Sequence, residues 1–245
     1  MINQNLESLR DEIDGIDSQI VDLLNQRVQA AAEIGKIKNE LGVDPYDPAR
    51  EEQVFAKLGD LNRGPLSKDS LRIIYREVIS ASIALEKKLI IGYLGPEATY
   101  THQAAVNNFG SILEYRPLYD IPDVFQAVER AECDYGVVPI ENSTEGAVNR
   151  SLDLLVETEL TIVAQVFLKV EHALFSYSPL DKIDEVRSKD QALAQCGEWL
   201  RRNLPNVRLI PVTSTAEAVK GIIPNSNSAA IAGKLAGRIY EVPTQ

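Results

Sequence analysis

Arg27 is the first residue whose position suggests chemistry, because it interrupts an apolar stripe near the N-terminus. The stripe repeats every three or four positions and consists of Leu6, Leu9, Ile13, Ile16, Ile20, Leu23, Ala30, Ile34, Ile37 and Leu41. Four positions after Leu23 the repeat reaches an arginine instead of an aliphatic residue. A buried cation without a partner is strongly unfavourable. Arg27 therefore predicts an ion pair, a charge that extends to solvent at the rim of the stripe, or an anion site.

Arg10 and Lys38 are two further cations on one edge of this stripe, each one position past an apolar residue. They are 38 − 10 = 28 residues apart, which is about 42 Å along an α-helix. One small ligand cannot contact both from the same chain. If both serve one site, Arg10 must come from an antiparallel partner chain; otherwise both are solvated surface cations.

A second cluster of charged residues follows a turn at residues 42–45. Asp47 is predicted to be a helix N-cap and Pro48 the first helical residue, a combination typical of helix starts. Arg50 and Glu51 then lie on the first helical turn. For Asp47, capping alone is the alternative to a role in binding.

The stripe predicts one long helix over residues 6–41, about 50 Å in length. A single helical unit of this size is too narrow to cover such a stripe, so a partner chain is expected. A second helix is predicted from Pro48, and a third from the N-cap Ser67 through Ser82 to Glu86.

After residue 90 the sequence changes to short β-rich runs separated by helical segments, which is typical of an α/β domain. The β-rich runs are residues 89–94, 135–140, 160–170 and 207–212. Helical segments lie between them. The predicted domains are therefore all-α over 1–88 and α/β over 90–245.

Composition narrows the class of protein. The chain has 245 residues and a net charge of 25 − 36 = −11, which argues against nucleic-acid and anionic-membrane partners. Two cysteines, Cys133 and Cys196, and two histidines, His102 and His172, are too few for a disulfide framework or a metal cluster. No run is long enough to span a bilayer. We expect a cytoplasmic protein without metal or cofactor. His172 is expected to have a structural role, and the role of His102 stays open. Both cysteines are expected to be buried.

Residues 5–88 closely resemble the all-helical chorismate mutases. The segments that carry the resemblance are 9–14, 16–27, 34–38 and 47–51. The resemblance implies a three-helix domain in an intertwined homodimer that converts chorismate to prephenate. The catalytic residues that it implies are Arg10 from the partner chain, Arg27, Lys38, Asp47, Arg50, Glu51, Ser82 and Glu86.

The resemblance also implies roles for these side chains. Arg27 and the partner chain's Arg10 bind the two carboxylates of the substrate, for which guanidinium groups are suited. Lys38 donates to the ether oxygen, and Glu86 donates a second hydrogen bond, which requires its protonated form. For Glu86, an ordinary exposed glutamate is the alternative.

Asp47 and Glu51 hold the ring hydroxyl in the same resemblance, while Arg50 adds positive potential. No covalent intermediate is needed, so catalysis consists of holding the reactive conformer and stabilising charge on the breaking bond.

Residues 90–245 resemble prephenate dehydratase, whose fold has two lobes around a cleft like a periplasmic binding protein. The segments that carry this resemblance are 95–105, 138–146, 171–174, 191–196 and 214–216. The lobes are expected at about 90–165 and 166–245. The expected cleft residues are Thr99, Glu141, Asn142, Ser143, Ser214 and Thr215. Turn and capping chemistry is the alternative for Asn142, Ser143, Ser214 and Thr215.

The order of the two halves is that of the bifunctional mutase–dehydratases of phenylalanine biosynthesis. The chain stops at Gln245, before a Thr-Arg-Phe segment and a regulatory ACT domain that the family usually has. We therefore expect weak or absent dehydratase activity and no feedback by phenylalanine. Two alternatives remain at this stage: a non-catalytic anion-binding α/β module, and a long helix that only dimerises the chain.

Overall fold

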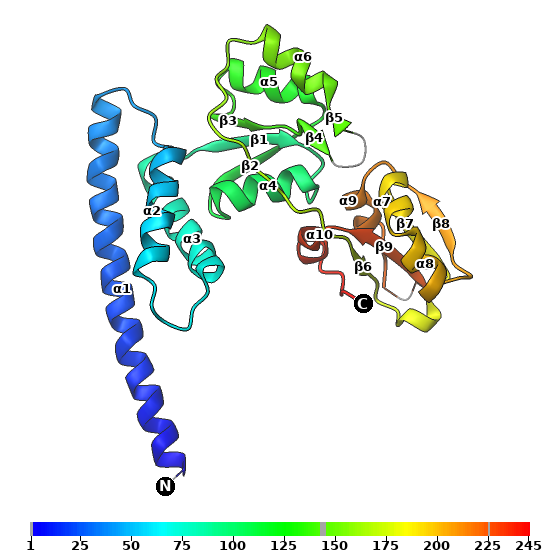
Figure 1. The fold of residues 1–245 in the computed structure, drawn as a ribbon, viewed down its shortest axis with the longest axis horizontal. Helices are drawn as coiled ribbons and strands as arrows, with labels where there is room; N and C mark the ends of the chain where they lie inside the picture. The colour runs from blue at the N-terminus through cyan, green and yellow to red at the C-terminus, as the bar shows by residue number, and fades with distance from the viewer. Residues whose placement is uncertain (1, 143–145, 225) are drawn as a thin grey trace. The chain divides into compact units, whose positions relative to one another are not determined.

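The computed structural model describes residues 2–142, 146–224 and 226–245. The chain divides into two compact units (Figure 1). The helical unit contains the chain up to Leu89 together with Phe109–Glu114, and the α/β unit contains Ile90–Asn108 and Tyr115–Gln245.

Three helices form the first unit, as the sequence predicts. They are α1 (Ile2–Glu40), α2 (Pro48–Leu61) and α3 (Lys68–Glu86). Asp47 caps α2 by accepting a hydrogen bond from the backbone N–H of Arg50, and Ser67 caps α3 in the same way through Ser70. These caps fix both helix starts at the predicted positions.

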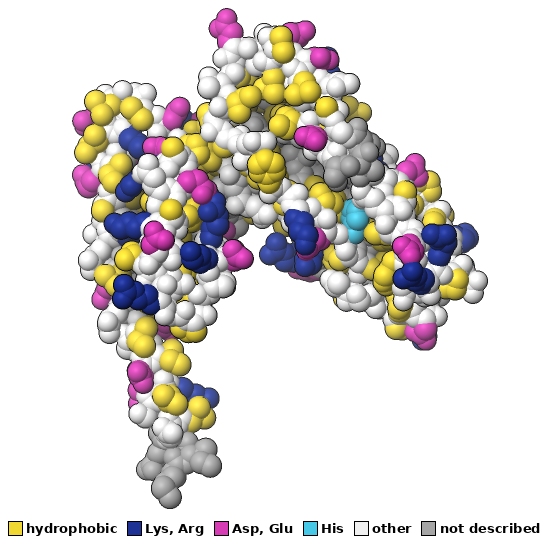
Figure 2. All heavy atoms as spheres, in the orientation of Figure 1, with side chains coloured by type: hydrophobic (Ala, Val, Ile, Leu, Met, Phe, Trp, Pro, Cys, Tyr) yellow, Lys and Arg dark blue, Asp and Glu magenta, His cyan; other side chains and the backbone are white. Residues whose placement is uncertain are grey.

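The N-terminal part of α1 extends beyond α2 and α3 (Figure 1). Its apolar side chains are exposed in the single chain, and Figure 2 shows them along the projecting helix. Leu23, next to the predicted interruption of the stripe, is 63% exposed. A continuous apolar face of this length is unusual on a monomer and marks an interaction surface.

A short segment distant in sequence completes the helical unit. The ring of Phe109 lies 4.7 Å from that of Tyr46, and the backbone N–H and Oγ of Ser111 donate to the carboxylate of Glu77. Gly110 has φ +86°, and a Cβ on it would lie 2.4 Å from Cβ of the buried Ser80. Only glycine fits both this conformation and this close approach.

The α/β unit begins with a three-stranded sheet in the order β2-β1-β3, in which β1 and β3 are parallel. Its elements are β1 (Ile90–Leu94), α4 (Tyr100–Phe109), β2 (Glu114–Leu118), α5 (Ile121–Glu129), β3 (Tyr135–Val137), the short strands β4 (Glu141–Asn142) and β5 (Gly146–Ala147), and α6 (Asn149–Glu157).

A second lobe contains a four-stranded sheet in the order β6-β9-β7-β8, parallel except for β6 against β9. Its elements are β6 (Ala173–Phe175), the 3-10 turn η1 (Leu180–Lys182), β7 (Glu185–Ser188), α7 (Asp190–Gln195), α8 (Gly197–Asn203), β8 (Arg208–Pro211), α9 (Thr215–Lys220), β9 (Ser228–Ala232) and α10 (Lys234–Ile239). Phe175 packs against small side chains of α9, β9 and α10 in its core.

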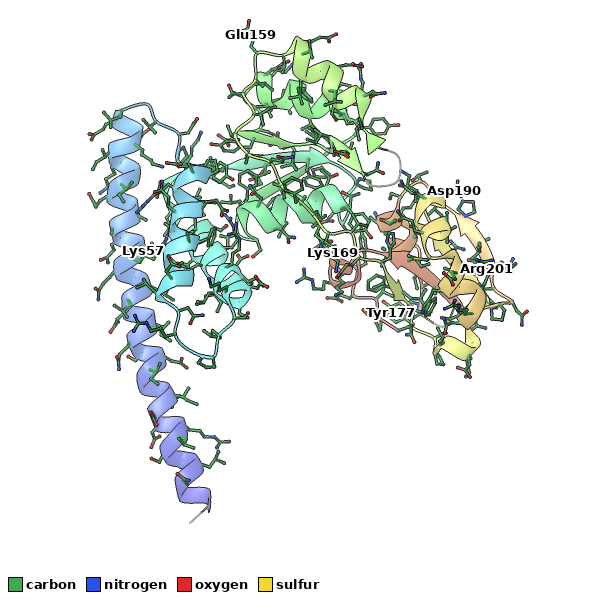
Figure 3. The ribbon with its side chains drawn as sticks, in the orientation of Figure 1. Lys57, Glu159, Lys169, Tyr177, Asp190 and Arg201 are labelled. Carbon is green, nitrogen blue, oxygen red and sulfur yellow. The ribbon has the colours of Figure 1, made fainter. Side chains whose placement is uncertain are left out.

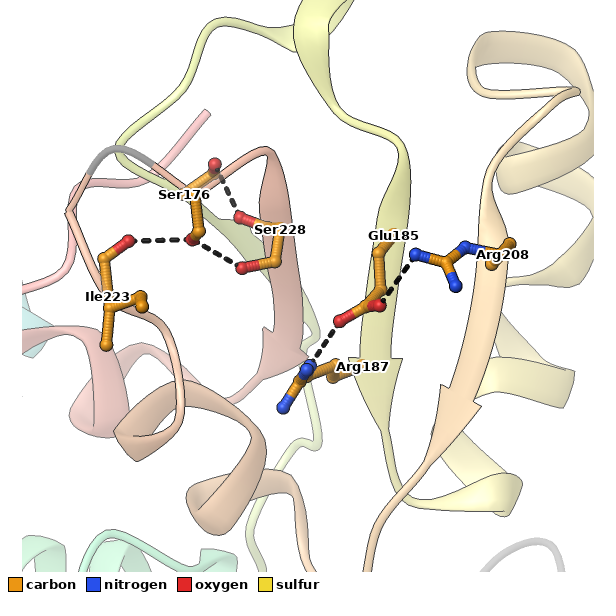
Figure 4. A network of polar contacts seen from close by, with 7 residues as sticks. Ser176, Glu185, Arg187, Arg208, Ile223 and Ser228 are labelled. Carbon is orange, nitrogen blue, oxygen red and sulfur yellow. Dashed lines mark hydrogen bonds and ion pairs between the residues drawn. The ribbon is translucent and has the colours of Figure 1, made fainter.

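Polar side chains tie this second sheet together at one end (Figure 4). Glu185 accepts from Arg187 Nε at 2.5 Å and from Arg208 Nη2 at 3.3 Å, which links β7 to β8. Ser176 Oγ donates to the carbonyl oxygen of Ser228 at 2.9 Å. The Glu185–Arg208 contact thus joins β7 to β8, and the Ser176–Ser228 contact joins the end of β6 to β9.

One predicted strand is wrong. Residues 158–172 form an irregular connection between the lobes, along which Figure 3 labels Glu159 and Lys169. The apolar residues at 160–170 have no neighbouring strand, and Phe167 is 88% exposed. β-branched residues favour a strand only where a sheet partner satisfies the backbone. Within the described part of the chain, no helix combines the length and hydropathy needed to cross a membrane.

Candidate active site

Arg27 and Ser82 meet where α1 packs against α3. Arg27 Nη1 donates to Ser82 Oγ at 2.9 Å, and Ser82 Oγ donates in turn to the carbonyl oxygen of Val78 at 2.9 Å. The Arg27 side chain is half-buried, and among the described residues no carboxylate forms an ion pair with it. Within the described part of one chain, the guanidinium therefore keeps unused donors for an anion.

Lys38 of α1 and Glu86 of α3 lie further along the same pair of helices. We call the surface formed by Arg27, Ser82, Lys38 and Glu86 the α1–α3 strip. Lys38 follows Arg27 by eleven residues, which is about three helical turns and so the same face of α1. Lys38 Nζ donates to the carbonyl oxygen of Pro45 at 2.9 Å. Burial raises the pKa of the Glu86 carboxyl above its usual range, while the charge of nearby Lys38 opposes this. Glu86 is thus half-buried and not an ordinary exposed glutamate.

Gly35 allows α1 and the Glu86 side chain to come together. A Cβ at Gly35 would lie 2.5 Å from Glu86 Cγ and 2.8 Å from its Oε2. The sequence analysis missed this residue. The sequence does carry a signal for Gly35, because a glycine inside a predicted helix lowers helix stability by about 1 kcal/mol relative to alanine and so needs a reason.

The α2 residues behave differently from one another. Asp47 is the N-cap, with Oδ1 accepting from the Arg50 backbone at 2.9 Å. The Arg50 side chain is exposed and donates to Gln53 at 3.2 Å. Glu51 is buried and pairs with Arg76 at 2.5 Å, a partner that the sequence analysis did not name.

Arg10 lies on the exposed, projecting part of α1. Because α1 is continuous from Ile2 to Glu40, the separation of about 42 Å from Lys38 persists in the folded chain. The structure of one chain therefore does not bring Arg10 to the strip formed by Arg27, Ser82, Lys38 and Glu86.

Several predicted dehydratase residues have capping roles. Ser214 accepts from the backbone N–H of Glu217 at 3.0 Å and is the N-cap of α9, of which Thr215 is the first residue. Thr99 Oγ1 donates to the carbonyl oxygen of Leu94 at 3.1 Å and accepts from the backbone N–H of His102 at 3.3 Å. For Ser214 the capping alternative is confirmed.

The other predicted cleft residues lie on or beside β4. Glu141 is an exposed residue of this strand, and Asn142 Oδ1 accepts from Gln191 Nε2 at 3.5 Å. Ser143, also predicted, lies outside the described residues.

Both histidines contribute to packing. His172 has a partner at each ring nitrogen, with Tyr100 Oη at 2.6 Å from Nδ1 and Gln195 Oε1 at 2.7 Å from Nε2. Both ring nitrogens of His172 therefore have partners, as expected of a structural histidine. His102 is buried, stacks on Tyr93 with ring centroids 4.4 Å apart, and has its pKa lowered by burial.

His102 Nδ1 accepts from the backbone N–H of Ala98 at 3.0 Å, so this histidine also holds a turn. Cys133 is buried as predicted, whereas Cys196 is only partly buried.

Two family matches divide the chain where its character changes. Residues 9–87 match the family described as Chorismate mutase type II, and residues 91–244 match Prephenate dehydratase. The bifunctional chorismate mutase/prephenate dehydratase of Aquifex aeolicus is 41% identical over 244 residues, and that of Neisseria gonorrhoeae is 43% identical over 243. Each match covers 98% of this chain and 67% of the relative.

A solved structure agrees for the α/β unit. Prephenate dehydratase from Arthrobacter aurescens, in complex with L-Phe, superimposes with a TM-score of 0.58 and 26% identity, covering 64% of this chain and 54% of that one. The chain therefore belongs to the bifunctional chorismate mutase/prephenate dehydratase family of phenylalanine biosynthesis, with an all-helical mutase domain followed by an α/β dehydratase domain.

Proposed function

We propose that the helical unit rearranges chorismate to prephenate in the strip between α1 and α3. The observation that carries this proposal is Arg27, a half-buried guanidinium whose hydrogen-bond partner is the neutral hydroxyl of Ser82. Such a cation is ready to bind a carboxylate without first breaking an ion pair. Lys38 lies three helical turns further along the same face of α1, and Glu86 lies near it at the end of α3.

The proposed mechanism uses positioning and electrostatics alone. Arg27 binds one carboxylate, and Lys38 and protonated Glu86 donate to the ether oxygen on which negative charge develops. Ser82 orients the guanidinium of Arg27.

The α2 residues complete the proposed pocket. Asp47 and Glu51 hold the ring hydroxyl, with Glu51 as the acceptor of its hydrogen, and Arg50 adds positive potential at the edge of the pocket.

The pocket is proposed to be completed by a second copy of this chain. The exposed apolar stripe of α1 supports a homodimer. An antiparallel partner would bring its own Arg10 across the interface, which resolves the separation of about 42 Å within one helix.

A continuous assay on chorismate tests the proposal. Loss of chorismate absorbance reports the mutase, and phenylpyruvate formation reports the dehydratase. No loss of chorismate by the purified chain would contradict the mutase proposal.

For the α/β unit we propose prephenate as the ligand and its conversion to phenylpyruvate as the reaction. Binding of prephenate without phenylpyruvate formation would instead support the anion-binding alternative. We also propose a domain boundary at residues 88–90 and a cytoplasmic location, where the free thiols of Cys133 and Cys196 stay reduced.

Replacing Glu86 with glutamine is expected to sustain mutase activity to higher pH than in the parent protein. The raised pKa of Glu86 means that its protonated, donating form exists below that pKa and is lost as pH rises through it. The glutamine amide donates at every pH. The measurement is kcat/KM against pH, with Glu40→Gln as a control on an exposed glutamate of α1; identical profiles for Glu86→Gln and the parent would refute this role.

Replacing Gly35 with alanine is expected to lower mutase kcat/KM by about 10²-fold, because the new methyl displaces the Glu86 carboxyl. The melting temperature should not fall, since alanine is the better helix former. Gly15→Ala, on the same helix, is the matched control and should retain activity, because no other part of the described chain beyond the helix's own backbone comes within 4 Å of the added Cβ. Equal activities of the two variants would exclude this role for Gly35.

A further inference from the structure

Glu51 is a buried carboxylate in which one oxygen accepts a hydrogen bond and the other has no donor among the described residues. Its Oε2 accepts from Arg76 Nη1 at 2.5 Å, and the two side chains are 9% and 10% exposed. Among the described residues, no donor reaches the buried Oε1 of Glu51. Leaving a buried charged acceptor unpaired is costly, so this oxygen fits a donor that arrives with a ligand.

The guanidinium of Arg76 is itself held in place from α2 and α3. Arg72 and Arg76 are one turn apart on α3, and their guanidinium carbons lie 4.3 and 4.8 Å from the ring centroid of Phe55. Arg72 also pairs with Glu52. Since a cation over the face of an aromatic ring is attracted to it, the contact with Phe55 helps to fix where the Arg76 fork points.

The charges around Glu51 come from α2 and α3. Burial raises the pKa of Glu51, and Glu52 raises it further, while Arg76 and Arg72 lower it, and the net direction is upward. Arg76 is thus the largest influence that favours the ionised form. The ionised carboxylate is an acceptor at both oxygens, whereas in the protonated acid one oxygen becomes a donor, and a hydrogen bond to a charged acceptor is the stronger one.

We infer that Arg76 is a positioning residue that holds Glu51 so that its second oxygen accepts the ring hydroxyl of the bound substrate. This inference rests on the proposed mutase function. Arg76 itself does not touch the substrate; it fixes the rotamer and the charge of the residue that does.

The test compares Arg76→Gln, Arg76→Lys and the exposed Arg63→Gln in the full chain, with kcat/KM for chorismate measured against pH. Arg76→Gln is expected to lower kcat/KM by about 10- to 100-fold. It should also move the acidic limb of the profile to higher pH, because the carboxylate form exists only above the pKa of Glu51. Arg76→Lys should restore the position of that limb, and Arg63→Gln should match the parent.

A second measurement separates positioning from folding. With a chorismate analogue in which hydrogen replaces the ring hydroxyl, Arg76→Gln and the parent should have the same kcat/KM, since the positioned oxygen has no donor to accept from. If Arg76→Gln does not fold, Arg76→Lys and the double variant Glu51→Gln/Arg76→Gln, which removes the uncompensated buried charge, are used with both substrates.

An equal loss on both substrates, or an acidic limb that does not move in any Arg76 variant, would overturn the inference. Failure of the proposed function itself looks different, because the unmodified protein would then not turn over chorismate at all.

Discussion

Replacing Arg27 with alanine is expected to lower mutase kcat/KM by about 10²- to 10³-fold, which is the typical loss when one charge-stabilising donor is removed from an active site. The variant should fold, because the partner of Arg27 among the described residues is the hydroxyl of Ser82, and that hydroxyl keeps its bond to the Val78 carbonyl. Arg27→Lys should be intermediate, since an ammonium keeps the charge and loses the bidentate fork.

The measurement is initial rate against chorismate concentration, together with a thermal unfolding curve for each variant. Arg63→Ala, an exposed arginine on the α2–α3 connection, is the control and should retain full activity. An Arg27→Ala enzyme with parental kcat/KM would show that the anion site lies elsewhere.

Mixing two inactive variants is expected to restore about one quarter of the parental mutase activity. Arg10→Ala and Arg27→Ala each damage both pockets of a homodimer. In an exchanged 1:1 mixture about half of the dimers are mixed, and each mixed dimer has one pocket with both arginines intact. The helix geometry supports this result, because Arg10 and Arg27 of one chain then belong to different pockets.

The activity should appear only after subunit exchange, for example after dilution from mild denaturant, and size-exclusion chromatography should show a dimer throughout. The double variant Arg10→Ala/Arg27→Ala mixed with the parent is the control. It should give no gain beyond the parental dimers, because each mixed dimer then has one arginine missing from each pocket. Failure of the single variants to complement would mean that each pocket is built from one chain.

Local sequence chemistry predicted the helical unit well. The Asp47-Pro48 pair and Ser67 were sufficient to place the starts of α2 and α3, since capping depends on a few neighbouring atoms. The interruption at Arg27 identified the most informative cation, because an arginine within an apolar stripe conflicts with the pattern around it.

Pairings between distant residues were harder to predict. Arg76 lies 25 residues from Glu51, and nothing in the spacing of an ordinary amphipathic helix distinguishes a buried arginine from a surface one. Gly35 and Glu86 meet only once α1 and α3 are packed. Such contacts are set by tertiary packing, which a single sequence does not encode in any local pattern.

The β-rich half shows the same limit in a different form. β9 consists of small residues, Ser228–Ala232, all of them buried, and its alanine content gives no strand signal. The apolar run at 160–170 has that signal and forms no strand. Sheet membership depends on which neighbours are present, so residue preference alone selects the wrong segment here.

The segment Phe109–Glu114 has a practical consequence for anyone who wishes to excise the helical enzyme. A piece that ended at residue 88 would lose the Phe109 ring from Tyr46 and the glycine backbone from Ser80. Tyr46, which is buried in the intact chain, would then be exposed to water. A separate helical domain therefore needs a polar residue at this position, or residues 109–114 attached to it by a linker.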